Sequence, residues 1–163
     1  MSTLIPGRDG EPLLPGMWVL RLAPVSKDPA LTTAAIMSAL APSTGDRNRQ
    51  PMRVSVWAEL LTSYRQAWEL TGRRHQVALR MNVDWARALS ISLNDGTMLM
   101  LDVVWEPLSG DGCEPDTRPG ADGHSGITGF GDPRMMKSQR KQLRSQLADR
   151  IAEAKSIVQL QAN

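Results

Sequence analysis

Two runs of alternating apolar residues around a tight turn constrain the fold of this chain more than any other feature. Residues 90–93 read Ser-Ile-Ser-Leu, residues 97–104 read Thr-Met-Leu-Met-Leu-Asp-Val-Val, and Asn-Asp-Gly lies between them. Alternation with a period of two is typical of strands, and the glycine of the turn accepts a positive φ. The sequence therefore predicts an antiparallel β-hairpin.

Four further segments predict the rest of a mixed core. Residues 17–22 and 75–82 favour strands, the first as a short apolar run and the second by alternation. Residues 30–40 form an apolar stretch behind Asp28-Pro29, and residues 56–71 place Trp57, Leu60, Leu61, Tyr64 and Trp68 on one helical face. We therefore expect an α+β fold, with a small antiparallel sheet or barrel and two packed helices.

Charge is distributed unevenly along the 163 residues. The formal charge is +2 for residues 1–105, −5 for residues 106–133 and +5 for residues 134–163. The middle segment holds seven glycines and four prolines in 28 residues, a composition that disfavours a packed core. These patterns predict an α+β core at 1–105, an acidic Gly/Pro-rich flexible linker at 106–133 and a long basic amphipathic helix at 134–163.

The predicted C-terminal helix has an apolar stripe and a basic flank. Asp132 is placed to cap it, with Pro133 as its first helical residue. At 100° per residue, one face collects Leu143, Leu147, Ile151, Ala154 and Val158. The flank contains Lys137, Arg140, Lys141 and Arg144, early in the helix, where the helix dipole disfavours cations. A bound polyanion, the acidic linker or plain solvation would each accommodate that flank.

Motifs for catalysis, metal binding and cofactor binding are weak or missing. Cys113 is the only cysteine, so neither an internal disulfide nor a paired-thiolate zinc site can form. His75 and His124 have no metal-ligand spacing and no neighbouring nucleophile motif. We expect no cofactor, no metal and no catalytic residue.

The chain also has no apolar run near the roughly 18 residues that a membrane helix needs, and its first residues lack the pattern of a signal peptide. We expect a cytoplasmic protein without a membrane partner.

One segment is similar to a known family. Residues 77–97 read VALRMNVDWARALSISLNDGT, which combines a strand, a short turn, a second strand and an Asp-Gly hairpin. With its following strand, the segment 77–104 resembles the C-terminal small β-barrel of Mu-like and Tn7-like DDE transposases. The usual proline after the turn aspartate and the large catalytic domain are both missing. The resemblance implies a barrel that binds DNA or a transposition partner without strand-transfer activity.

Two functional hypotheses follow, and an enzyme with a site that no motif reveals is a third. The first is a non-catalytic nucleic-acid-associated accessory protein, possible in a phage or mobile-element system. It would contact phosphate through Arg73, Arg74, Arg80, Arg87, Lys137, Arg140, Lys141 and Arg144. The second is an adaptor subunit whose C-terminal helix docks on a protein partner or on its own copy through Leu143, Leu147, Ile151, Ala154 and Val158.

Overall fold

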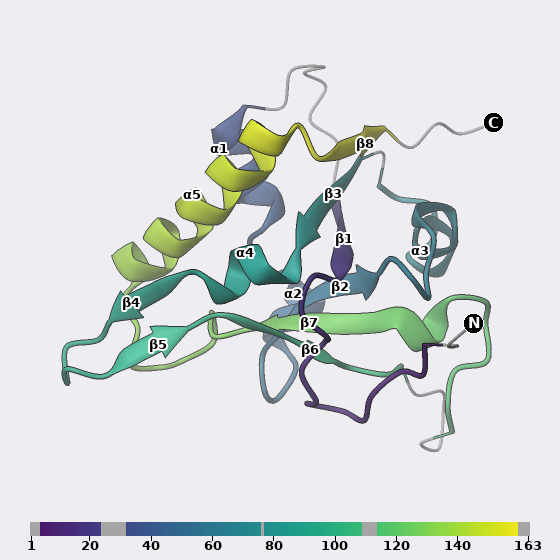
Figure 1. Ribbon diagram of the computed structural model, residues 1–163, viewed down its shortest axis with the longest axis horizontal. Helices are drawn as coiled ribbons and strands as arrows, with labels where there is room; N and C mark the ends of the chain where they lie inside the picture. Colours follow the sequence, from purple (N-terminus) through teal and green to yellow (C-terminus); the bar gives the residue numbers. More distant parts are fainter. Residues whose placement is uncertain (1–3, 24–31, 76, 109–113, 160–163) are drawn as a thin grey trace.

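The computed structural model describes residues 4–23, 32–75, 77–108 and 114–159 (Figure 1). Its strands are β1 (Trp18–Ala23), β2 (Val54–Ala58), β3 (Val77–Asn82), β4 (Ser90–Ser92), β5 (Met98–Met100), β6 (Asp102–Trp105), β7 (His124–Thr128) and β8 (Ile157–Gln159). Its helices are α1 (Thr33–Ala39), α2 (Thr44–Arg47), α3 (Tyr64–Leu70), α4 (Val83–Arg87), α5 (Lys137–Ala154) and the 3-10 helix η2 (Ala121–Gly123). The predicted α+β class is confirmed.

Six strands form one antiparallel sheet in the order β6-β7-β2-β1-β3-β8, and β4 and β5 form a separate hairpin. Of the two predicted alternatives, an open sheet and a barrel, the structure has the open sheet. The predicted hairpin is confirmed, with Ile91 opposite Leu99 and Gly96 at φ +84°. Its second strand, predicted over residues 97–104, is divided in the structure: β5 stays in the hairpin and β6 joins the main sheet. The strands expected at residues 17–22 and 75–82 are β1 and β3.

Helices cover both faces of the sheet. In Figure 1, α1 and α5 lie together on one side, and α3 lies on the other. The larger core joins α1 and α5 to one sheet face, including Val19, Val56 and Leu79, all fully buried. The smaller core joins α3 to the opposite face around Leu20 and Trp57. This two-sided burial explains why β1 is apolar at nearly every position.

The helix predicted at residues 56–71 is wrong in its first half. Val54, Val56 and Ala58 are fully buried on β2, which pairs with β1 and β7. The chain then turns, and Ser63 starts α3 with a capping box. The apolar residues fit both a strand and a helical face, and pairing with neighbouring strands selects the strand.

The segment expected to be a flexible linker, residues 106–133, contains an inner strand. β7 lies between β6 and β2 and aligns Gly126 with Ser55 and Val104. A Cβ on Gly126 would lie 2.6 Å from the Cβ of Arg53, so this glycine permits close packing. The flexible-linker prediction is therefore wrong for His124–Thr128, because glycine there permits close packing between strands. Residues 109–113 lie outside the described part.

The C-terminal helix is shorter than predicted. α5 starts with Met136 as its N-cap residue, whereas the Asp132 carboxylate accepts the backbone N–H of Arg134 at 2.9 Å. The helix ends where Lys155 adopts φ 50°, and β8 follows as an edge strand beside β3. The region 134–163 is therefore not one helix, because pairing with the open edge of β3 replaces the last helical turns.

The first helix also begins later than expected. Thr32 caps α1 by accepting the backbone N–H of Ala35 at 3.2 Å. The expected cap at Asp28-Pro29 lies outside the described residues. Between α1 and β2 the chain forms the short helix α2, which begins with a capping box between Ser43 and Asp46.

Candidate functional site

The four arginines predicted to contact phosphate from the core do not form one free positive surface. Three of them pair with carboxylates: Arg73 with Glu69 at 2.9 Å, Arg80 with Glu59 at 2.5 Å and Arg87 with Asp102 at 2.7 Å. The Arg80 guanidinium also lies 4.0 Å from the ring centroid of Trp18. Arg74 is exposed and forms no salt bridge with a described residue. These carboxylates compete with phosphate for the same donors.

The basic flank of α5, by contrast, takes part in a cluster of cations. Lys137, Arg140 and Arg144 line a cavity of about 420 Å³ together with Arg47, the last residue of α2. We call this cavity the basic cleft. Its remaining lining residues are Pro42, Met52, Phe130 and Gly131. Lys141 is exposed on the same helix but does not line the cavity.

The positive charges of the basic cleft act on one another. Burial lowers the pKa of Arg144, and the neighbouring charges of Arg47 and Arg140 lower it further. None of the four cations forms a salt bridge within the described part of the chain, and no carboxylate lines the cavity. The cluster is therefore electrostatically unfavourable by itself, and a bound anion would relieve it.

The guanidinium groups also have unused hydrogen-bond donors. The Nε atoms of Arg140 and Arg144 are buried without a partner among the described residues. One terminal nitrogen of Arg140 donates to the backbone carbonyl of Asp132 at 3.1 Å. Buried donors are normally paired, and guanidinium groups match the oxygens of phosphate and carboxylate. The cleft is thus suited to an oxyanion.

The position of the cleft along α5 adds to its positive potential. Lys137 is the first helical residue, and Arg140 and Lys141 follow within the first two turns. A helix dipole makes cations there unfavourable by about 0.3–1 kcal/mol each and anions favourable. An anion in the cleft would interact favourably with both the side chains and the helix end.

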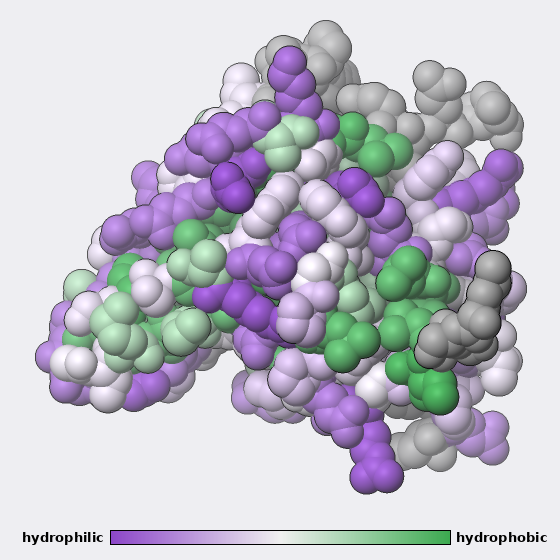
Figure 2. Space-filling model, viewed as in Figure 1, coloured by the Kyte–Doolittle hydropathy of each residue, from purple (hydrophilic) through white to green (hydrophobic). Residues whose placement is uncertain are grey.

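The apolar stripe predicted to dock a partner belongs to the protein's own core. Leu143, Leu147 and Ile151 are fully buried against α1 and the sheet. Ala154 is exposed at the helix end, and Val158 packs on the smaller core from β8. The docking prediction is therefore corrected, because the face of α5 that would bind a partner is already occupied. Figure 2 shows mostly hydrophilic side chains on the outer side of α5.

Sequence reasoning missed one member of the cleft. Arg47 lies more than 90 positions before Arg140 and reaches the cleft because α2 packs near α5. The only signal was its place in a polar, arginine-rich stretch with Arg49 and Arg53. Those two are used elsewhere, since both pair with Glu106.

The described residues bring together no group of three or more His, Cys, Asp or Glu side chains that could hold a metal ion. Among the described helices, none has the length and apolar character needed to cross a bilayer. Comparison with protein-family models, curated proteins and solved structures gives no match to this chain. The resemblance of residues 77–104 to a transposase barrel stays a prediction; in the structure this segment is divided between the main sheet and the hairpin.

Proposed function

We propose that this protein is a non-catalytic nucleic-acid-associated accessory protein that binds the phosphate backbone through the basic cleft. The observation that carries the proposal is the set of four cations around one cavity with no carboxylate in its lining. Lys141 extends the positive surface along α5. A phage or mobile-element setting remains an expectation from the sequence.

The arrangement favours contacts to phosphate over recognition of base sequence in this cleft. Arginine and lysine contacts to phosphate fix the position of a protein on nucleic acid and carry no sequence information. Each neutralised phosphate on duplex DNA adds about −0.9 to the slope of log affinity against log salt. Binding through the cleft should therefore weaken steeply as salt rises.

Charge reversal tests the proposal. We expect Arg140→Glu combined with Arg144→Glu to lower the affinity for labelled DNA many-fold at low salt and to reduce the salt slope by about 1 for each lost phosphate contact. Fluorescence anisotropy over a salt series measures both quantities.

The matched control reverses Arg73 and Arg74 instead, which changes the net charge equally but lies outside the cleft. We expect only a small loss of affinity from it. Equal losses in the two double variants would mean that net charge and not the cleft determines binding, and no binding by the unaltered protein at low salt would reject the function. Thermal unfolding by circular dichroism checks that both variants are folded.

A further inference from the structure

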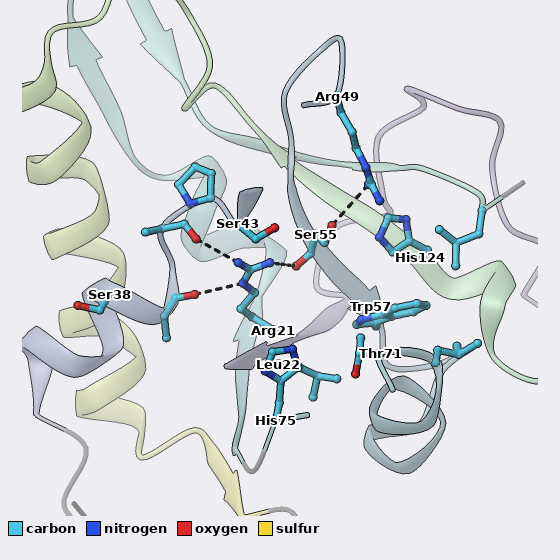
Figure 3. Close-up of a pocket in the computed structure, with 15 residues that line it drawn as sticks. Arg21, Leu22, Ser38, Ser43, Arg49, Ser55, Trp57, Thr71, His75 and His124 are labelled. Carbon is cyan, nitrogen blue, oxygen red and sulfur yellow. Dashed lines mark hydrogen bonds between the residues drawn. The ribbon is translucent and has the colours of Figure 1, made fainter. Parts of the chain in front are cut away.

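A second cavity adjoins the basic cleft. It has a volume of about 500 Å³, and Pro42 lines both cavities. Helix α2 connects them, because its N-cap residue Ser43 lines the second cavity and its last residue Arg47 lines the cleft. Ser43 and Arg47 are about one helical turn apart, which corresponds to a rise of about 5.4 Å along the helix. We call the second cavity the histidine cavity, since His75 and His124, the two histidines of the chain, both line it (Figure 3).

Arg21 accounts for the opening in the sheet where this cavity lies. β1 and β2 pair at Val19–Ala58 and Leu20–Trp57, and the Arg21 side chain then bonds to β2 in place of further strand pairing. Its guanidinium donates to the Ser55 carbonyl at 2.9 Å and to the Asp46 carboxylate at 3.3 Å. Further bonds to the carbonyls of Ala39 and Ala41 tie it to the end of α1, as the dashed lines in Figure 3 show. These bonds hold Arg21 between β2 and the end of α1, so they fix one wall of the cavity in the folded protein.

His124 offers a hydrogen-bond acceptor to the histidine cavity. Its Nδ1 lies 2.7 Å from the Glu106 carbonyl oxygen, which can only accept, so Nδ1 carries the proton. Burial lowers the pKa of His124 to about 4, so the ring is neutral near pH 7 and Nε2 keeps its lone pair. The ring packs edge-on to Trp57 at 4.8 Å between centroids, which fixes its orientation. No described residue forms a hydrogen bond with Nε2.

The rest of the lining combines apolar walls with polar side chains, among them the guanidinium groups of Arg21 and Arg49. Ser43 Oγ accepts the backbone N–H of Asp46 at 3.1 Å, and its hydroxyl hydrogen has no acceptor among the described residues. His75 Nδ1 is buried without a partner among the described residues. The larger apolar side chains of the walls are Leu22, Trp57, Leu70 and Leu108. Such a lining is suited to a flat heteroaromatic group with polar edges.

We propose that the histidine cavity receives one base of a single-stranded nucleic acid whose phosphates lie in the basic cleft. This inference rests on the proposed function of the cleft. A pyrimidine such as thymine carries an N–H that can donate to His124 Nε2 and carbonyl oxygens that can accept from a hydroxyl such as that of Ser43. A base within a duplex must first leave the stack, so a single strand is the ligand.

The two histidines make the cavity directly observable. We expect oligothymidylate to shift the imidazole NMR signals of His75 and His124, and an abasic sugar–phosphate strand of the same length to shift them little. One accommodated base should also make oligothymidylate bind about five- to hundred-fold more tightly than the abasic strand. Equal shifts and equal affinities for the two strands would overturn the inference while leaving phosphate binding in place. Failure of both strands to bind while duplex DNA binds at low salt would also overturn the inference alone, whereas failure of both strands and of the duplex would reject the proposed function itself.

A matched pair of variants tests the position of the base. Ser43 and Ser63 are both exposed N-cap serines with a capping box, but only Ser43 lines the histidine cavity. We expect Ser43→Trp to fill the cavity and abolish the preference for oligothymidylate while affinity for the abasic strand is kept. Ser63→Trp loses the same cap and should retain the preference. A preference unchanged in Ser43→Trp would contradict base binding in this cavity.

Discussion

His124 is a residue whose environment cannot be predicted from its neighbours in the chain. The run Gly-His-Ser-Gly has poor strand propensity and lies in an acidic, glycine-rich segment, which favoured assignment to a linker. In the structure His124 is 2% exposed on an inner strand, held by Trp57 and the Glu106 carbonyl. Both partners come from other strand regions, so only the sheet order shows that this histidine is buried and neutral.

Burial of His124 makes stability sensitive to acid. The pKa of this ring falls from 6.5 in the unfolded chain to about 4 in the folded protein. Above the unfolded value neither state is protonated; as the pH falls toward 4, the unfolded state alone takes up a proton and stability is lost. We expect this group to remove about 2 kcal/mol between about pH 7 and pH 5.

Urea unfolding of the protein and of His124→Gln at the two pH values measures this loss. Glutamine keeps a donor for the Glu106 carbonyl and has no proton to gain in this range. The variant should therefore lose less stability on acidification, whatever its stability at neutral pH. His75→Gln is the control for the second ring, whose pKa is lowered first by burial and then by the charges of Arg21 and Arg74. The same acid-induced loss in the protein and in His124→Gln would contradict the assignment.

At the scale of elements, local pattern predicted some strands and failed for others. β1, β3 and the β4–β5 hairpin follow from alternation, apolar runs and turn chemistry in their own sequence. β2 and β7 did not, because a buried strand of mixed composition is defined by its neighbours and not by its own period. These two strands are adjacent in the sheet, so two separate errors, a helical period read over β2 and a linker composition read over β7, left out the centre of the fold.

Glycine in β7 provides a test of packing at this scale. We expect Gly126→Ala to destabilise the protein by about 1–3 kcal/mol, since the added methyl group would meet Arg53 at 2.6 Å. Gly45→Ala in α2 is the control: the nearest atom to its Cβ is Ser43 Oγ at 3.7 Å, so it should be neutral or slightly stabilising. Chemical denaturation measures both. A neutral Gly126→Ala would mean that β7 is not packed as described.

At the scale of the whole molecule, the charge segregation has a structural use. The acidic segment forms pairs within the fold: Glu106 with Arg49 and Arg53, Asp116 with Arg118 at 2.7 Å, and Asp132 with Arg134 at 2.9 Å. Among the described residues, none of those carboxylates forms a salt bridge with the basic flank of α5, although the charge of Arg140 helps to lower the pKa of Asp132. Three cations of the flank line a cavity with Arg47 instead. Three of the four cations of the basic cleft were predicted from the helical flank, and the fourth required the tertiary arrangement.

The same arrangement changes what is expected of a chain that ends after Pro133. If residues 1–105 folded alone, this truncation would leave the core intact. In the structure, however, α5 contributes three fully buried side chains to the core, those of Leu143, Leu147 and Ile151. Each such side chain contributes about 2–5 kcal/mol to the free energy of unfolding. Their combined loss is comparable with the whole stability of a domain, about 5–15 kcal/mol.

We therefore expect the chain truncated after Pro133 to show no cooperative unfolding transition in urea and to bind a hydrophobic dye at neutral pH. Leu147→Ala in the full chain is the control, which should lower the free energy of unfolding by about 2–5 kcal/mol and keep a cooperative transition. A truncated chain that unfolds cooperatively at the original urea midpoint would show that α5 is dispensable. In that case the basic cleft would lie on an appendage, and Arg47 would not be held opposite Arg140 and Arg144.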